Sequence, residues 1–498
     1  MKHLIMLPIL LPLFSGSLLL IGNRLDLRWQ RLFSCLACFL LLPVGVLLVH
    51  QADSGVLYSY ALGNWQAPFG IALLLDRLSA MLLLLTAILG SVAVIYACRG
   101  DDRRGASFHA LLQFQLLGIN GAFLTADLFN LFVFFEILLI ASYALLLHGH
   151  GRARVGAGLH YVALNLFGSA LFLIALGMLY GVAGTLNMAD LAHKVGLANA
   201  EQRPLLAAAG LLLLVVFGLK AALLPLYFWL PRAYSAATAP VAALFAIMTK
   251  VGIYSILRVY TLVFGSAAGA LENLAHDWLW PLALLTLLAG LIGALAAQSL
   301  GMLVSYLVVV SVGTLTAGLA LGTAEALSAS LYYLLHSTLI AAGLFLLVDM
   351  IARQRGDKHD ALVQGPKLMQ PNLLGGLFFL GAIAVAGLPP LSGFIGKLLL
   401  LQAVSGAQAL LLWPMLLGGG LLTLVALSRA GSMLFWKVGL HMHDRATSDA
   451  WRTLACCSLL AASIVLMLGA APLLAYTRAT ARQLLDLAPY LSLVGGGA

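Results

Sequence analysis

The sequence contains few charged residues. Asp, Glu, Lys and Arg together make up 9% of the 498 residues, whereas 62% are hydrophobic and the mean hydropathy is +1.03. Soluble domains usually have about a quarter of their residues charged. This composition is that of an integral membrane protein, and it predicts one all-α, polytopic membrane domain over residues 1–498.

Sequence motifs for nucleotides, metals and nucleophilic catalysis are also absent. The chain has no phosphate-binding loop, dinucleotide fingerprint, metal-ligand cluster or nucleophile triad. ATP is therefore not expected to drive activity within this chain, and the sequence predicts no cofactor and no metal. Its few cysteines lack the spacing of a metal site or a disulfide framework, so we interpret them as apolar packing residues. They are Cys35, Cys38, Cys98, Cys456 and Cys457.

Apolar segments of membrane-spanning length recur along the whole chain. About 20 apolar residues cross a bilayer as a helix. The first segment follows a basic residue, as in a signal peptide, but it reaches spanning length without a small-residue cleavage site, which favours a first membrane helix. The fourteen predicted spans are 4–22, 32–49, 78–98, 108–125, 128–147, 158–182, 205–224, 240–263, 278–297, 300–322, 326–349, 373–399, 406–428 and 454–475.

The basic residues are distributed unevenly between the two sides of these spans. Loops after odd-numbered spans hold 17 Lys and Arg residues, whereas the opposite side, with both termini, holds 5. Basic loops stay cytoplasmic. We therefore expect both termini on the non-cytoplasmic side, and the net charge of +9 does not indicate nucleic acid.

Two spans carry prolines beside a lysine. The seventh has two prolines after Lys220, and the twelfth has the run GLPPLSGFIGK, which ends at Lys397. Paired interruptions in two halves of a chain indicate a transporter built from repeats. The sequence thus predicts two inverted five-helix repeats, 108–263 and 278–428, with helices 7 and 12 broken.

Glu136 lies in the middle of an otherwise apolar span, LFNLFVFFEILLIASYALLL. A charge at bilayer depth costs roughly 2.5–3.5 kcal/mol on insertion scales, so a buried acid indicates function. Lys220, Lys250 and Lys397 have equally apolar surroundings. One acid and three amines in the membrane predict a path for protons or cations.

These residues suggest a switchable proton relay. An acid and an amine on adjacent helices can pass between ionised and neutral states when one nearby charge moves. We predict that Glu136 and Lys220 form the pair, that Lys250 comes next, and that Lys397 is the terminal site. Histidine side chains ordinarily titrate near neutral pH. His336 stands between the halves, where it would bridge Lys250 and Lys397 or act only as a packing residue.

Other interpretations stay open. The pair of Glu136 and Lys220 would alternatively be a static ion pair. Arg258 is interpreted as an interfacial snorkelling residue, and the aromatic run 227–229 as an interfacial belt. Asp127 is either a helix cap or the outer mouth of an access path.

One further pair of charges lies at the end of a predicted helix. Asp349 and Arg353 are four residues apart. Residues at this spacing meet on a helix surface. We interpret them as a surface pair.

Three runs, FLTADLFNLFVFFEILLIASYALLL, VFGLKAALLPLYFWLPRAYSAATAP and IMTKVGIYSILRVY, resemble the MrpD-type (also called PhaD or MnhD) component of the multi-subunit Mrp-type cation/proton antiporters. They more distantly resemble the antiporter-like subunits of respiratory complex I. The similarity extends from LPILLPL through GNWQAPFGI and TLNMADL to GLPPLSGFIGK.

This resemblance implies a partnership and an activity. The chain would be one of about six or seven different membrane subunits of a complex in a bacterial inner membrane, and would exchange H⁺ for Na⁺ or K⁺ in pH homeostasis and salt tolerance. Glu136 and Lys220 match the family's essential pair, and Lys250 and Lys397 match its further lysines. Many relatives have a lysine one turn beyond His336, but STLIAAGL follows it here, so the connection between the halves would depend on this histidine and water.

Two rival functions stay open at this point. The chain would alternatively be a proton-pumping subunit of a quinone- or hydrogenase-linked oxidoreductase, or a scaffold that carries no protons. In the most similar complex I subunit the residue matching Lys397 is a glutamate, so the lysine favours the antiporter.

Overall fold

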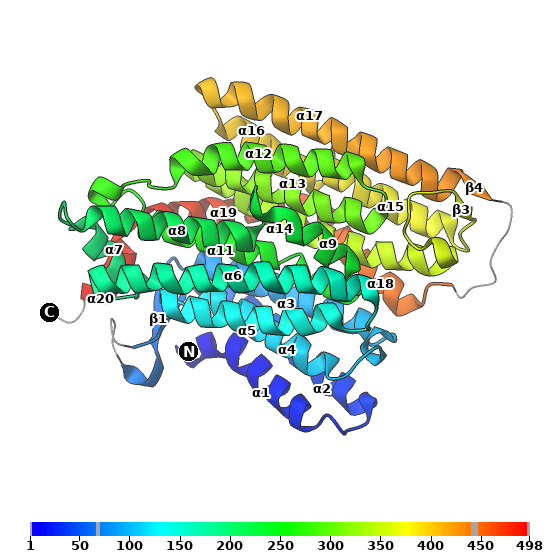
Figure 1. The fold of residues 1–498 in the computed structure, drawn as a ribbon, viewed down its shortest axis with the longest axis horizontal. Coiled ribbons are helices and arrows are strands. Elements are labelled where there is room, and N and C mark those ends of the chain that lie inside the picture. Colours follow the sequence, from blue (N-terminus) through cyan, green and yellow to red (C-terminus); the bar gives the residue numbers. More distant parts are fainter. Residues whose placement is uncertain (1, 66–69, 440–446, 496–498) are drawn as a thin grey trace.

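The computed structural model describes residues 2–65, 70–439 and 447–495. Within these ranges the chain is a bundle of helices that run mainly along one direction, with α1 and α2 at one long edge and α16 and α17 at the other (Figure 1). Except at their ends, helices satisfy their backbone hydrogen bonds internally, which is what a lipid environment demands. The prediction of an all-α polytopic membrane protein is confirmed.

The first half of the chain contains eleven α-helices in the described residues. They are α1 (Leu7–Ile21), α2 (Leu27–Ala52), α3 (Arg77–Ala97), α4 (Phe108–Leu124), α5 (Leu128–Leu147), α6 (Arg152–Ala183), α7 (Met188–Gly196), α8 (Arg203–Ala221), α9 (Trp229–Ala236), α10 (Ala239–Phe245) and α11 (Met248–Leu262).

The second half continues in the same way. Its helices are α12 (His276–Ala296), α13 (Leu300–Leu321), α14 (Ala324–Arg355), α15 (Pro371–Ala386), α16 (Ser392–Ala403), α17 (Gly406–Gly431), α18 (Ala450–Leu468), α19 (Ala470–Leu485) and α20 (Ala488–Gly495).

Short elements join these helices. Strands β1 (Tyr58–Ala61) and β2 (Ala72–Leu75) pair antiparallel, and β3 (Gly365–Pro366) and β4 (Val438–Gly439) pair parallel. The one-turn helices are η1 (Lys2–Met6), η2 (Leu62–Asn64), η3 (Asp101–Arg103), η4 (Leu226–Phe228), η5 (Gly269–Leu271), η6 (Gly356–Lys358) and η7 (Ser432–Trp436).

All fourteen predicted spans overlap helices. Twelve segments of the described chain are long and apolar enough to cross a membrane. The other two predicted spans are α4, which has 17 residues, and the broken pair α15 and α16. The last predicted span was wrong at its end, because α18 stops at Leu468 and α19 begins after Gly469.

The helices differ in what surrounds them. Almost all residues of α10, α11, α13 and α14 are buried, so these helices form the centre of the bundle. Helices α1, α6, α12, α17 and α18 keep much of their apolar surface exposed. Apolar residues exposed over such an area fit contact with lipid or with other membrane subunits.

Helix breaks occur beside the buried lysines Lys220 and Lys250 and beside the half-buried Lys397. As predicted, the seventh and twelfth spans are interrupted: Lys220 is the penultimate residue of α8, and Lys397 follows the gap between α15 and α16. A break between α10 and α11, just before Lys250, was not predicted. There the backbone hydrogen bonds join residues three apart, as in a 3₁₀ helix, and Lys250 N–H donates to the Ile247 carbonyl at 2.9 Å.

Candidate buried charge site

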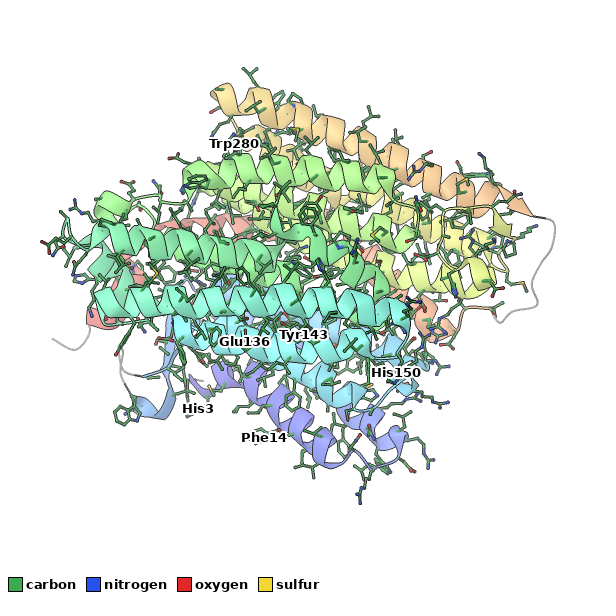
Figure 2. All side chains as sticks on the ribbon, viewed as in Figure 1. His3, Phe14, Glu136, Tyr143, His150 and Trp280 are labelled. Carbon is green, nitrogen blue, oxygen red and sulfur yellow. The ribbon has the colours of Figure 1, made fainter. Side chains whose placement is uncertain are left out.

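The predicted site residues lie on helices that form a continuous row, in which each helix contacts the next. Contacts run from α5 to α6, then to α8, α11, α13, α14 and α16. Glu136 lies in the middle part of α5 (Figure 2). The chain of helix contacts therefore crosses the bundle from α5 toward its opposite edge at α16.

Glu136 and Lys220 are connected through a serine. Ser169 on α6 donates a hydrogen bond to Glu136 Oε1 and accepts one from Lys220 Nζ at 3.4 Å. Lys220 is 4% exposed and also donates to the carbonyl and side-chain oxygens of Asn165, at 3.3 and 3.4 Å. The prediction of a pair holds only indirectly, because no salt bridge joins the two charges among the described residues.

Lys250 is completely buried and has only neutral partners among the described side chains. Its Nζ donates to Thr249 Oγ1 at 3.2 Å and to Ser311 Oγ on α13 at 3.3 Å. Its helix packs closely on α8, since a Cβ on Gly252 would come within 2.4 Å of the Ala221 nitrogen. The absence of a side chain at Gly252 therefore lets the two lysine-bearing helices meet.

His336 lies on α14, which contacts both α13 and the Lys397 helix α16. It is 1% exposed, and its Nδ1 lies 2.7 Å from Ser392 Oγ on α16, which is 2.8 Å from Ser463 Oγ on α18. A cavity of about 20 Å³, roughly the space of one water molecule, is lined by Ser311, which contacts Lys250, and by His336. No sequence pattern marks these serines, because isolated hydroxyls are common in apolar helices.

Lys397 interacts with the end of a helix instead of with an acid. Its Nζ donates to the carbonyls of Val385 and Ala386, at 3.1 and 2.9 Å, at the C-terminus of α15. The last carbonyls of a helix lack intrahelical partners and carry a partial negative charge. A helix break thus supplies the counter-charge that the sequence does not show.

Gly387 makes this contact possible. Its φ is +80°, and a Cβ there would lie 2.8 Å from Lys397 Cδ. Gly387→Ala is expected to lower stability by roughly 1–2 kcal/mol, the cost of a left-handed conformation for a residue with a side chain. Heating the detergent-purified protein and measuring the folded fraction by size exclusion tests this. Gly376→Ala, in an open position of α15, is the matched control and should be neutral or stabilising; equal losses would contradict the assignment.

Three of the simpler interpretations are corrected by the structure. Arg258 does not snorkel: it is 2% exposed, and its guanidinium lies 2.7 Å from Asp76. Burial alone would raise the pKa of the Asp76 carboxyl, but Arg258, the Ser79 N–H and the Tyr490 hydroxyl together lower that pKa. Arg258 therefore anchors the start of α3, and the chemical partner that explains its burial lies far away in the sequence.

The pair at the end of α14 is part of a larger network. Arg353 lies 2.5 Å from Asp349 and 2.9 Å from Asp101, and the Tyr96 hydroxyl donates to Asp349 at 2.7 Å. The predicted pair of Asp349 and Arg353 therefore forms, but as part of a network with Asp101 and Tyr96 and not as a separate surface pair.

Of the remaining two interpretations, the aromatic belt is corrected and the Asp127 cap is confirmed. Trp229 is 2% exposed and donates to the Leu219 carbonyl, so it does not belong to an interfacial belt, whereas Phe228 is 57% exposed. Asp127 caps α5 by accepting from Asn130 N–H at 2.8 Å, which confirms the capping interpretation.

Comparisons with known proteins agree with this arrangement. Residues 125–423 match the family described as NADH:quinone oxidoreductase/Mrp antiporter, transmembrane. The chain is 42% identical to the D-type subunit of a probable K(+)/H(+) antiporter of Rhizobium meliloti, over 97% of this chain and 96% of that protein. It is 38% identical to the D-type subunit of the Na(+)/H(+) antiporter of Alkalihalophilus pseudofirmus, over 99% of both chains.

A solved structure is also similar over almost the whole length. The Mrp complex from Dietzia sp. DQ12-45-1b contains a chain that superposes with a TM-score of 0.87 at 25% identity, covering 99% of both chains. The chain therefore belongs to the NADH:quinone oxidoreductase/Mrp antiporter family of membrane proteins, among the D-type subunits of cation/proton antiporters.

Proposed function

We propose that this chain is the proton-translocating subunit of a multi-subunit antiporter that exchanges H⁺ for Na⁺ or K⁺. Its partners would be other membrane subunits, as in the similar Mrp complex. The observation that carries the proposal is the hydroxyl of Ser169, which touches both a carboxylate and an amine in the middle of the membrane domain.

This hydroxyl can transmit a proton in a balanced step. The Lys220 ammonium gives a proton to Ser169 Oγ while the hydroxyl proton passes to Glu136, which leaves a neutral amine, a protonated acid and an unchanged serine. The reverse step restores both charges. A positioned group that is both donor and acceptor lowers the barrier to such transfers.

The second half of the path would run through Lys250, His336 and Lys397. A charge on one buried amine disfavours a charge on its neighbour, because Coulomb repulsion is strong at low dielectric. Protonation of Lys220 therefore affects Lys250 on the adjoining helix. Ser311 and the one-water cavity support a continuation from Lys250 to His336 without the additional lysine found in many relatives.

Ser169 offers a test of the first transfer. Ser169→Ala is expected to slow exchange about tenfold or more, because it removes the bridging hydroxyl, whereas Ser169→Thr keeps the hydroxyl and should retain most activity. Ser458→Ala, at an exposed position of α18, is the matched control. Exchange should be measured in everted vesicles with a fluorescent ΔpH indicator. Normal rates in Ser169→Ala would exclude the serine from the path.

The activity itself can be tested with the whole complex. Vesicles with all subunits should show Na⁺- or K⁺-dependent proton exchange, and vesicles that lack only this chain should not. Proton movement that requires NADH or a quinol, and no cation, would instead indicate an oxidoreductase component. A complex that assembles and exchanges normally without this chain's buried charges would indicate a scaffold.

We further propose that the protein lies in the bacterial inner membrane with both termini on the non-cytoplasmic side. The termini lie toward the same end of the bundle, and η3, β3 and β4 lie toward the other (Figure 1). Two of the basic loops used for the prediction, with Arg103 and Arg353, are at that second end, while Arg445 lies outside the described residues. Basic loops are retained in the cytoplasm.

Labelling of single cysteines tests this orientation. Lys358→Cys, beside α14, should resist a membrane-impermeant maleimide in intact cells, whereas Asn199→Cys, between α7 and α8, should react; both positions are exposed. Everted vesicles should give the opposite result. Labelling of Lys358→Cys from outside intact cells would contradict the orientation.

A further inference from the structure

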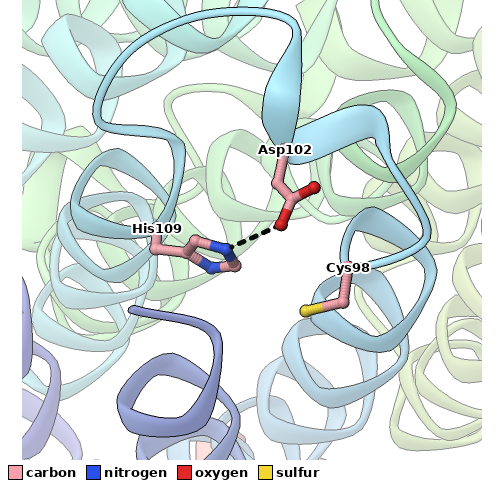
Figure 3. A group of neighbouring side chains, drawn as sticks. All are labelled: Cys98, Asp102 and His109. Carbon is pink, nitrogen blue, oxygen red and sulfur yellow. Dashed lines mark hydrogen bonds and ion pairs between the residues drawn. The ribbon is translucent and has the colours of Figure 1, made fainter. Parts of the chain in front are cut away.

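Four side chains with metal-binding atoms meet at the end of the bundle that carries η3. Cys98 directly follows α3, Asp102 lies in η3, and His109 is in the first turn of α4. One ligand atom from each lies within 4.8 Å of the other two, and Figure 3 shows all three facing a common gap. Cys35 from α2 extends the group, with its Sγ 3.9 Å from Cys98 Sγ.

The imidazole and the carboxylate are enclosed by protein, and the two cysteines are half-buried. The side chains of His109 and Asp102 are 1% and 0% exposed, and His109 Nε2 lies 3.2 Å from Asp102 Oδ2. Arg31 holds the same carboxylate through two hydrogen bonds, Nε to Oδ2 at 2.6 Å and a terminal nitrogen to Oδ1 at 2.8 Å. The carboxylate is thus oriented before any ligand arrives, as the supporting shell of a metal site requires.

The combination of sulfur, nitrogen and oxygen ligand atoms favours zinc. Thiolate, imidazole and carboxylate are the ligands of zinc, and two sulfurs on a tetrahedral zinc with bonds of about 2.3 Å lie roughly 3.8 Å apart. The two cysteine sulfurs here are 3.9 Å apart. Hard cations such as Na⁺ and K⁺ prefer oxygen ligands, so a site containing thiolates is unsuited to a transported alkali cation.

We propose that Cys35, Cys98, Asp102 and His109 bind one zinc ion, which ties α2, α3 and α4 together. The metal would lie between His109 Nε2 and Asp102 Oδ2, where it replaces the proton that these atoms share. Two thiolates and a carboxylate carry three negative charges, which Zn²⁺ and the Arg31 guanidinium together balance. Neutrality matters at a buried site, because an unbalanced charge there is costly.

This proposal is independent of the transport function. None of the four ligands belongs to the row of Glu136, Lys220, Lys250, His336 and Lys397. Spacing alone does not reveal the site, because Cys35 is contributed by a different helix and the turn at η3 separates Cys98 from His109.

Metal analysis of the intact complex tests the site. The complex, purified under reducing conditions, should contain about one zinc per chain, and Co²⁺ exchanged into it should give a near-ultraviolet thiolate-to-cobalt absorption band. Cys98→Ser should weaken the band, because only the Cys35 thiolate remains, and should weaken zinc binding at least about tenfold. The double variant Cys35→Ser, Cys98→Ser should lose the band. Cys457→Ser, a half-buried cysteine on α18, is the matched control and should change neither the band nor zinc binding.

Three outcomes would overturn the proposal. One is a folded wild-type complex without zinc that gives no cobalt band. Another is a cobalt band that persists in the double variant Cys35→Ser, Cys98→Ser, which would locate the metal elsewhere. The third is a Cys35–Cys98 disulfide, found by peptide mass spectrometry of complex purified with a thiol-blocking reagent, which would make the sulfurs a redox pair. The wild-type measurement decides even if Cys98→Ser does not assemble.

Discussion

Glu136→Ala and Lys220→Ala are each expected to reduce cation-dependent proton exchange by at least about a hundredfold, the usual effect of removing a proton-transferring side chain. Each substitution removes one end of the bridge through Ser169. It also leaves the remaining charge uncompensated in a low-dielectric environment, where it would be held in one state. Exchange in everted vesicles should be compared at equal amounts of membrane-inserted protein.

Matched controls separate these effects from a general loss of charge. Glu325 begins α14 and Lys437 follows η7, and both are exposed. Glu325→Ala and Lys437→Ala should therefore exchange at nearly the rate of the unsubstituted protein. Substantial exchange in Glu136→Ala would remove that carboxylate from the path, whatever its neighbours do.

Lys397 is expected to need the ability to lose its proton. Lys397→Ala and Lys397→Arg should both be strongly impaired, by about a hundredfold for a lost proton-transfer site, although arginine keeps the positive charge. An arginine side chain stays protonated in proteins. Its guanidinium could still donate to the carbonyls of Val385 and Ala386, so the contact with α15 would survive while proton release would not.

The comparison of Arg and Ala at this position distinguishes two roles. Lys437→Arg is the control for the substitution itself, since Lys437 is exposed outside the helices of the path. If Lys397→Arg exchanges protons nearly normally while Lys397→Ala does not, the site needs only a fixed positive charge. The twelfth span would then no longer serve as the end of the proton path.

The sequence predicted the helices well because lipid leaves the backbone few alternatives. Each of the fourteen predicted spans overlaps a helix, and prolines correctly indicated the breaks after Lys220 and before Lys397. The break between Phe245 and Met248 was not predicted, because the run ALFAIMTK contains neither glycine nor proline. The division into two inverted repeats stays a prediction.

The partners of the charged residues were harder to predict. Each buried charge was recognisable from its cost in the membrane, but the groups that satisfy it lie on other helices. Ser169, Ser311 and the carbonyls at the end of α15 carry no distinguishing pattern. The assignment of Arg258 was wrong for the same reason, because its partner Asp76 precedes α3. The roles of the five site residues stay predictions until transport is measured.

The most direct test of the proton relay is the exchange activity of the double variant Glu136→Gln, Lys220→Met. This variant removes both charges at once, so no uncompensated charge remains and the fold should be preserved. If the two residues relay protons, the double variant assembles with its partners and stays as inactive as either single alanine variant. If it exchanges Na⁺ or K⁺ for protons at a rate near that of the unsubstituted complex, the two residues are a static pair and the relay is contradicted.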